Sequence, residues 1–386
     1  MDDLLQLPWF SDAQRELVRE LHARAGAERW LDPGIDDAAA LRAALGALGR
    51  WGYLRLTVSE PWNLTNNVLA REALAYHCGI ADLAFVMQAL GALPILLMGS
   101  EATKAVLLPK VASGEACMAF ALSEPEAGSD VAALTTTARR EAQGGYRIQG
   151  CKHLISNAGV ADYYTVFART GEGKKGISAF VVHARAPGVE IERQVPSAPH
   201  PLGIVRFADV AVPSSALLGA EGDGLKLALM TLERCRTTVG AAACGFARRA
   251  LDEALKHCRG RRMFGSTLSE QPLAQARLAE MQARLEASRL LVYRAAWAYD
   301  QSAGRTRITR QAAVAKWQAT ENAQWIIDQA LQLAGGLGVL QGSIFERLYR
   351  EIRPLRIYEG ASEVQQLVIA RELLSSPAAA PQEPLP

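Results

Sequence analysis

The residue best placed to do chemistry lies near the C-terminus, in a Tyr-Glu-Gly sequence centred on Glu359. A carboxylate on a glycine-marked turn before a helix could act as a general base toward a ligand lying across the turn. Ser362, followed three residues later by Gln365, has the pattern of a capping box, so we predict that the helix begins near Glu363. An isolated Tyr-Glu-Gly is more often a surface turn, so the assignment of Glu359 as a base depends on the rest of the chain.

Two segments in the middle of the chain carry small and polar residues of possible use to a ligand. In residues 120–130, Glu124-Pro125 interrupts regular structure, while Gly128 and Ser129 offer main-chain N–H groups and a hydroxyl to a polar group such as a phosphate. A loop between domains explains these residues equally well. Residues 150–157, Gly-Cys-Lys-His-Leu-Ile-Ser-Asn, read as a turn into a strand and alone predict no chemistry.

Three further segments lie in the C-terminal half. Residues 232–245 begin with charges and continue with Ala and Gly, which favours a helix whose body packs closely. Arg-Arg-Met-Phe-Gly at 261–265 breaks two helical patterns, and a pair of solvated charges explains it. Gln-Leu-Ala-Gly-Gly-Leu-Gly at 332–338 follows a helical pattern rather than a strand, so we predict a helix C-cap instead of a dinucleotide-binding turn.

Bulk properties bound the class of protein. The 386 residues predict two or three domains, and 49% hydrophobic with 21% charged residues is ordinary for a soluble globular protein. A net charge of +2 gives no electrostatic reason to expect nucleic acid or a membrane surface as partner. Six cysteines without metal-ligand spacing predict reduced thiols and no metal site. The first residues lack a basic signal region and no apolar run looks long enough to span a bilayer, so we expect a cytoplasmic protein without membrane insertion.

The elements that must position these residues fall into three blocks. Apolar residues at helical spacing run to about residue 119, short β-prone runs follow up to about residue 213, and long helical patterns return from Gly224. Four long helices suit an antiparallel bundle. We therefore predict a mainly α, α+β fold with a helical domain at 1–119, a β domain at 120–221, a four-helix bundle at 222–374 and a disordered Pro- and Ala-rich tail at 375–386.

In this order, the segments resemble the acyl-CoA dehydrogenase family, flavoenzymes that oxidise acyl-CoA thioesters. The resemblance runs from about Phe10 to Leu374. It implies the acyl-CoA dehydrogenase fold, in which the middle domain is a β-barrel, and it implies FAD as cofactor. It further implies a homodimer or homotetramer, with electron-transfer flavoprotein as the electron acceptor.

The resemblance also implies which residues hold FAD. Main-chain groups at Leu122 and Ser123 would bind the pyrimidine edge of the flavin, and Ser129 would lie near the pyrophosphate and the CoA arm. Ser156 keeps a hydroxyl that could bond flavin N5. Leu154 replaces a tryptophan that would shield the flavin, and Ala361 replaces a threonine. The cofactor-binding residues implied in this way are Phe120, Leu122, Ser123, Gly128, Ser129, Leu154, Ser156, Arg261, Phe264, Gln332, Gly335, Gly336, Ala361 and Glu363.

Among these, the segments containing Arg261, Phe264 and Gln332 would reach the FAD of a neighbouring subunit. For the substrate, the resemblance implies contacts from Ser129, Glu233, Arg236, Tyr358 and Gly360. Cys235 stands where some branched-chain members keep their carboxylate, and a thiol serves poorly there, which leaves Glu359 as the base consistent with the family.

The implied reaction begins at the thioester, whose carbonyl would bond the Glu359 N–H and a ribityl hydroxyl of FAD. Glu359 takes the α-proton while hydride leaves the β-carbon for flavin N5, giving a trans-2-enoyl-CoA. Binding of an apolar acyl chain would raise the pKa of Glu359 by desolvation.

Several alternatives stay open on the same fold. A flavin oxidase would pass electrons to oxygen, a carrier-protein thioester could replace acyl-CoA, and a relative could act without dehydrogenation. A non-catalytic interaction protein or DNA-binding relative is disfavoured by the near-neutral charge. Pro199-His-Pro-Leu202 is an unfamiliar pattern before a β-prone run, which suggests a specialised subfamily. A short, branched or cyclic acyl group is our preferred substrate class.

Overall fold

The N-terminal third is built from helices whose starts are fixed by side-chain caps. The computed structural model describes residues 3–30 and 36–375. The hydroxyl of Ser11 forms a capping box with Gln14, and Asp36, Asn63 and Ser100 each accept an N–H at the start of their helices. The elements are α1 (Asp12–Ala27), α2 (Asp37–Arg50), α3 (Leu64–His77), α4 (Gly79–Met98) and α5 (Glu101–Ser113), with short 3₁₀ turns at Asp3–Gln6 and Tyr53–Thr57.

Helix α4 is the most apolar of the described α-helices. It has the length and composition to cross a membrane, so our expectation that no run is long enough was wrong. Of its apolar window, 94% is buried inside the protein, which is the behaviour of a core helix. Asp82 is its one charged residue, and the main core cluster forms where α4 packs against α3 and α6.

The middle of the chain forms one eight-stranded sheet with its own core. The strands are β1 (Met118–Ala121), β2 (Thr137–Arg140), β3 (Tyr146–Ser156), β4 (Tyr163–Arg169), β5 (Ile177–His183), β6 (Val189–Gln194), β7 (Leu202–Val212) and β8 (Leu217–Leu218). The hydrogen-bonded order is β6-β7-β3-β2-β4-β5-β8, with β1 parallel to β4. Strands β3 and β7 are antiparallel, and their register places Ser156 opposite Leu202. This pairing brings together two segments that are separate in the sequence.

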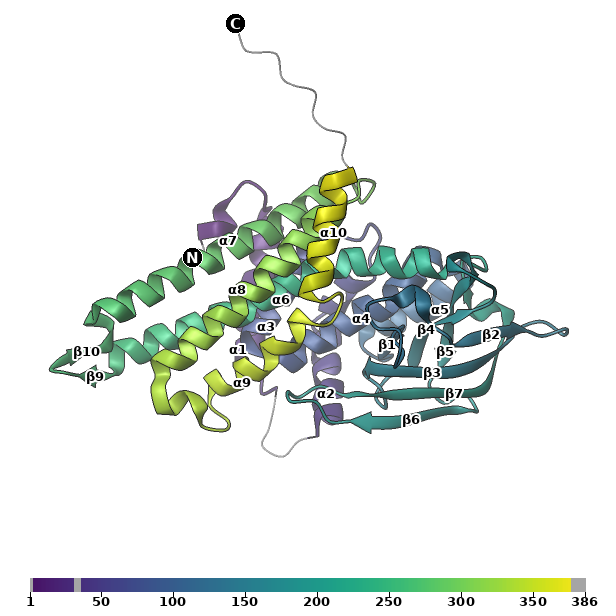
Figure 1. Ribbon diagram of the computed structural model, residues 1–386, viewed down its shortest axis with the longest axis horizontal. Coiled ribbons are helices and arrows are strands. Elements are labelled where there is room, and N and C mark those ends of the chain that lie inside the picture. The colour runs from purple at the N-terminus through teal and green to yellow at the C-terminus, as the bar shows by residue number, and fades with distance from the viewer. Residues whose placement is uncertain (1–2, 31–35, 376–386) are drawn as a thin grey trace, which may run out of the picture.

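The C-terminal third is a helical bundle. Its elements are α6 (Gly224–Gly260), α7 (Pro272–Gln301), α8 (Thr309–Ala334), α9 (Ile344–Ile352) and α10 (Ser362–Ser375), with a hairpin of β9 (Arg262–Met263) and β10 (Ser266–Thr267) between α6 and α7. The short hairpin lies at the end of the molecule opposite the sheet (Figure 1). The predicted sequence of helical, β and helical blocks is therefore confirmed, whereas the predicted tail lies outside the described residues except for Ser375.

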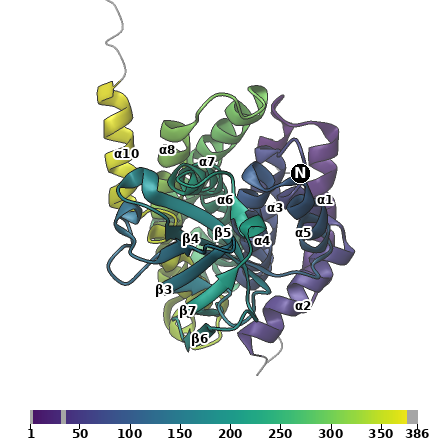
Figure 2. The ribbon, with the colours of Figure 1, turned by 90° about the vertical axis from the view of Figure 1, so that its right-hand side faces the viewer.

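Helix α6 joins the three blocks. Its small residues permit a close approach, because a Cβ on Gly245 would lie 2.3 Å from the backbone oxygen of Glu72 in α3. This confirms that the Ala and Gly run of α6 serves packing. Viewed from the sheet end, the N-terminal helices run along one side of the sheet and α7, α8 and α10 lie on the other (Figure 2). The turn before α10 thereby sits at the junction of the blocks.

Candidate active site

The turn that carries Glu359 is held by its own carbonyls. Glu359 has φ 52° and Gly360 has φ 94°, both in the left-handed region. Lys316 Nζ donates to the Gly360 oxygen at 2.8 Å, and Gln365 Nε2 donates to it at 2.9 Å. Arg236 Nε donates to the Glu359 oxygen at 3.3 Å. A Cβ on Gly360 would lie 2.3 Å from Gln365 Nε2, so glycine is required for this arrangement.

The predicted capping box does not form. Helix α10 begins at Ser362, whose hydroxyl donates to the Glu321 carboxylate of α8 instead of accepting an N–H of its own helix. Glu321 also pairs with Arg356 at 2.7 Å. Gln365 turns its amide toward the Glu359–Gly360 carbonyls. Both side chains that the capping pattern required are therefore engaged elsewhere, Ser362 with a distant helix and Gln365 with the preceding turn.

The carboxylate of Glu359 is left without a hydrogen bond. Its Oε2 atom is buried, and none of the described residues hydrogen-bonds to it. Burial raises the pKa of Glu359, while Arg71, Lys316 and Arg236 oppose this shift by favouring the charged form. A half-buried carboxylate with a raised pKa and free oxygens is suited to accept a proton from a ligand.

A buried ion pair that was not predicted from the sequence lies near this carboxylate. Arg71 of α3 contacts Asp82 of α4 through two hydrogen bonds of 2.8 and 2.7 Å, and its third nitrogen donates to Thr238 of α6 at 3.0 Å. Arg71 is 1% exposed and Asp82 is 4% exposed. A charge within each of two apolar stretches was the available signal, but only the fold shows that the two charges meet.

Cys235 lies in the same cluster and cannot replace Glu359 as base. The thiol is 1% exposed. Burial, reinforced by the charge of Glu359, raises the pKa of the Cys235 thiol well above its usual range. Cys235 is therefore a neutral, inert side chain near the carboxylate.

The predicted substrate contacts divide into two groups. Arg236 is 9% exposed and bonds the turn, and Tyr358 and Gly360 belong to the turn itself. Glu233 instead accepts the Ile308 N–H at 3.0 Å and the Thr309 hydroxyl at 2.9 Å, and thereby anchors the start of α8. A role for Glu233 toward the CoA arm stays a prediction.

The loop after β1 is supported from beneath by a second buried ion pair. Glu124 and Lys152 are in contact at 2.8 Å, with side chains 3% and 0% exposed. Glu124 also accepts the backbone N–H groups of Thr135 and Thr136 at 2.6 and 2.9 Å, and Lys152 donates to the Leu122 oxygen at 3.0 Å. Although burial acts to raise it, the pKa of Glu124 is lowered to about 2 by Lys152 and these hydrogen bonds.

The other residues predicted around the flavin line the same side of the sheet. The Ser123 oxygen accepts the His153 N–H at 2.9 Å, which ties the loop to β3. Leu154 follows with φ 54° and 56% exposure, and the Ser156 hydroxyl lies 2.8 Å from His200 Nε2. Phe120 is buried against Phe167, with ring centroids 4.9 Å apart.

These residues fit a flavin. The N–H and hydroxyl of Ser123 have no hydrogen-bond partner among the described residues, so they are available to the polar edge of a ring. The exposed apolar side chain of Leu154 is suited to cover the face of such a ring. Gly128 and Ser129 are exposed beside this loop, while Ala361 is half-buried and Glu363 exposed at the start of α10.

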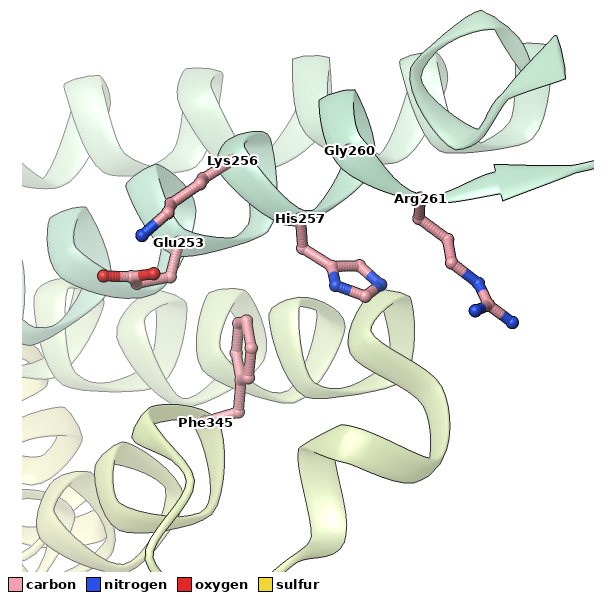
Figure 3. Close-up of a pocket in the computed structure, with 6 residues that line it drawn as sticks. All are labelled: Glu253, Lys256, His257, Gly260, Arg261 and Phe345. Atoms are coloured by element: carbon pink, nitrogen blue, oxygen red, sulfur yellow. The ribbon is translucent and has the colours of Figure 1, made fainter.

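The remaining predicted cofactor residues lie far from this loop. Arg261 and Phe264 flank the hairpin after α6, and Gln332, Gly335 and Gly336 end α8 at the same end of the bundle (Figure 1). Arg261 lines a cavity of about 400 Å³ whose other walls are Glu253, Lys256, His257, Gly260 and Phe345 (Figure 3). One chain does not bring these residues to Ser156, so their contact with FAD stays a prediction that requires a second subunit.

The comparisons with known proteins agree with this arrangement. Family models of the acyl-CoA dehydrogenase N-terminal, middle and C-terminal domains match residues 10–115, 119–210 and 222–374. The chain is 39% identical to cyclohexane-1-carbonyl-CoA dehydrogenase of Geobacter metallireducens over 80% of this chain and 81% of that protein.

Solved structures are similar over nearly the whole chain. Butyryl-CoA dehydrogenase of Megasphaera elsdenii matches with a TM-score of 0.87 and 31% identity, covering 95% of this chain and 99% of the other. A chain from work on the electron transferring flavoprotein of Acidaminococcus fermentans matches with a TM-score of 0.88, 31% identity and the same coverage.

The three matching domain models and the similar solved structures identify a flavin-dependent oxidoreductase. The chain belongs to the acyl-CoA dehydrogenase family, and its cofactor is FAD. The recognition made from the sequence is confirmed.

Proposed function

We propose that this protein oxidises an acyl-CoA thioester to its trans-2-enoyl-CoA, with Glu359 as the general base. FAD, when bound, supplies the acceptor for the hydride that leaves the β-carbon. The observation that carries this proposal is the buried Glu359 Oε2 without a hydrogen-bond partner among the described residues. A carboxylate so placed lowers the stability of the fold, because a buried polar atom loses its hydrogen bonds to water. Its retention therefore favours a role in the reaction.

The turn also offers a donor for the thioester carbonyl. The Glu359 N–H makes no hydrogen bond to another described residue, whereas the oxygens of Glu359 and Gly360 are both occupied. An N–H directed at the thioester oxygen would stabilise the negative charge that develops when the α-proton leaves. Base and donor then belong to one residue, whose backbone is held by α6, α8 and α10.

For the acyl group, we propose a short or cyclic chain, and among these we favour a saturated six-membered ring. The support is the 39% identity to a cyclohexane-1-carbonyl-CoA dehydrogenase. For the electron acceptor, we propose an electron-transfer flavoprotein, supported by the similarity to the chain from Acidaminococcus fermentans.

We further propose a homodimer or homotetramer. The segment after α8 exposes Leu337, Val339 and Leu340 by 56, 67 and 57%, and Phe264 is 88% exposed at the same end of the bundle. Exposed apolar side chains gathered at one place are typical of a surface that another chain covers. All six cysteines are free thiols, which agrees with the predicted cytoplasmic location.

The decisive experiment is an anaerobic titration of the FAD-loaded protein with straight, branched, cyclic and aryl-substituted acyl-CoA thioesters. Flavin absorbance is followed throughout. We expect bleaching by the cyclic or short thioesters, together with formation of the enoyl product.

Absence of bleaching by every thioester, in protein with full FAD content, would contradict the proposal and favour a carrier-protein substrate. Rapid reoxidation of the bleached flavin by air, without electron-transfer flavoprotein, would instead identify an oxidase.

A further inference from the structure

A histidine that the proposed reaction does not use lies against the flavin-side hydroxyl. The His200 Nε2 atom is 2.8 Å from Ser156 Oγ. The two residues are 44 positions apart in sequence and meet because β3 and β7 are antiparallel, with Ser156 opposite Leu202. The resemblance to the family implies that the Ser156 hydroxyl lies at the N5 edge of bound FAD, where hydride arrives in the proposed function. In that position, His200 would be one hydrogen bond removed from the reacting edge of the cofactor.

The loop that carries His200 is held on three sides. The His200 N–H donates to Asp37 of α2 at 3.0 Å, and the Pro201 oxygen accepts the Asn157 N–H at the end of β3 at 2.8 Å. Arg350 of α9 donates to the Ser197 oxygen at 2.6 Å. The prolines at 199 and 201 also limit the backbone of the loop. The imidazole therefore has a fixed position relative to Ser156.

A serine hydroxyl next to an imidazole loses its freedom to rotate. When the ring nitrogen donates to Ser156 Oγ, the hydroxyl proton is free to point toward the cofactor. When the ring nitrogen accepts, the hydroxyl proton points to His200 and only lone pairs face the cofactor. Either tautomer gives the hydroxyl one direction, and the two directions favour opposite oxidation states at N5, because N5 is an acceptor when oxidised and a donor when reduced.

The side chain is kept neutral by its surroundings. Burial lowers the pKa of His200 to about 4. The ring is therefore uncharged at neutral pH and acts on Ser156 by hydrogen bonding rather than by charge.

We propose that His200 is a positioning residue for the flavin, which orients the Ser156 hydroxyl and thereby sets the reduction potential of bound FAD. The inference rests on the proposed function only for the placement of Ser156 at N5. It assigns a role to the Pro-His-Pro segment, which the sequence analysis singled out without an explanation.

The test is a double-mutant cycle on the FAD-loaded protein, read by the midpoint potential of the flavin in a reductive titration against a reference dye. His200→Phe keeps the size and planarity of the ring but removes the hydrogen bond, and Ser156→Ala removes the hydroxyl. Each single variant should change the ratio of reduced to oxidised FAD at a fixed potential about tenfold, which is about 30 mV for a two-electron couple.

The double variant should shift the potential no further than Ser156→Ala alone, because His200 acts through the hydroxyl. His200→Gln, whose amide can reach the same oxygen, should restore the wild-type potential. The direction of the His200→Phe shift reports the tautomer. His183→Phe is the control, since it removes another histidine hydrogen bond in the same sheet, to the Arg185 N–H at 3.0 Å, and should leave the potential unchanged.

Additive shifts in the double variant, or an unshifted potential in His200→Phe, would overturn the inference. If His200→Phe does not fold, an unshifted Ser156→Ala alone overturns it. The titration uses no thioester, so a failure of the proposed reaction leaves this result readable. Bleaching by a thioester combined with an unshifted potential would refute the role of His200 alone.

Discussion

Two carboxylates of this protein, Glu124, which is buried, and Glu359, which is half-buried, differ in their partners. Glu124, under the loop after β1, has Lys152 at 2.8 Å and three further hydrogen bonds from Thr135 and Thr136. Glu359, on the turn before α10, has a buried oxygen that no described residue bonds. The first carboxylate has its pKa lowered to about 2 by its partners, and the second has its pKa raised by burial.

The difference separates a structural carboxylate from a chemical one. The partners of Glu124 hydrogen-bond both carboxylate oxygens, which lowers its affinity for a proton. The carboxylate thereby holds the loop in place. Around Glu359, the donors bond the backbone oxygens instead, so the turn is rigid while the carboxylate keeps its ability to bind a proton. Both carboxylates are beside cations, so it is hydrogen bonding, and not charge alone, that distinguishes them.

The largest effect is expected from neutralising the carboxylate of Glu359. Glu359→Gln keeps the shape of the side chain but removes the base, and we expect turnover to fall by about 10²–10⁴-fold with FAD still bound. The rate of anaerobic flavin bleaching by acyl-CoA measures the loss. Glu172→Gln, on an exposed hairpin, is the matched control and should bleach at the wild-type rate. A Gln variant that turns over normally would show that Glu359 is not the base.

The same substitution at the structural carboxylate should act on stability. Glu124→Gln leaves the Lys152 ammonium buried without its counter-charge, and we expect unfolding to be easier by about 3–5 kcal/mol. Denaturant unfolding measures the change in free energy. The matched control is Glu141→Gln, whose partner Arg147 lies at 2.9 Å in a pair whose side chains are 33 and 35% exposed, and it should lose at most about 1 kcal/mol. Equal losses in the two variants would remove the distinction between the two sites.

A third variant keeps the side chain of Glu359 and removes a cation beside it, together with that cation's hydrogen bond to the Gly360 oxygen. Lys316 favours the charged form of Glu359, so Lys316→Met should raise the pKa of Glu359 further. Because the base must be ionised, the acid limb of the pH–rate profile should move to higher pH, by about one pH unit. The profile of flavin bleaching measures this shift, and Lys226→Met, an exposed position on α6, should leave it in place. If the acid limb moved to lower pH, the charge of Lys316 would not be what lowers the pKa of Glu359.

The smallest effect tests the opposite signs of the two pKa shifts. The pKa of Glu124 is lowered on folding, so its contribution to stability is present above the ordinary value of 4.5 and is lost as pH falls toward about 2. The pKa of Glu359 is raised on folding, so the unfolded state ionises first, and stability falls as pH rises from the ordinary value of 4.5 toward the folded value.

Glu359→Gln should therefore be more stable than the wild type at neutral pH and equal to it near pH 4. Denaturant unfolding at both pH values measures the difference. A Gln variant that is less stable at neutral pH would show that the carboxylate is paired in solution.

Local patterns predicted the blocks of the fold, because helical spacing and β-prone runs need only neighbours in sequence, and these predictions agree with the structure. The choice of Glu359 as base depended instead on the resemblance of the whole chain to a family, and it stays a prediction. The prediction of a capping box at Ser362 was wrong because it considered only sequence neighbours. In the structure, the Ser362 hydroxyl donates to Glu321, 41 residues away. Arg71 and Thr238 are separated by 167 residues, and no local pattern reports such a contact.

The role of the Pro-His-Pro segment could not be predicted from the sequence either. The sequence marked it as unusual, but its meaning depends on the pairing of β3 with β7 and on a bond between His200 and Ser156. Chemistry at this site is assembled from separate elements, so it becomes visible only when the elements are placed together.

Helix α4 has a consequence for the chain while it is being made. During synthesis, α4 leaves the ribosome before α6, its partner in the core, has been translated, and it then presents twenty residues with one charge, Asp82. If a nascent segment of this composition meets the translocon, an aspartate opposes its insertion by about 3 kcal/mol at the centre of a helix and by less near its ends. The carboxylate that later binds Arg71 therefore also works against misdirection of the unfinished polypeptide into a membrane.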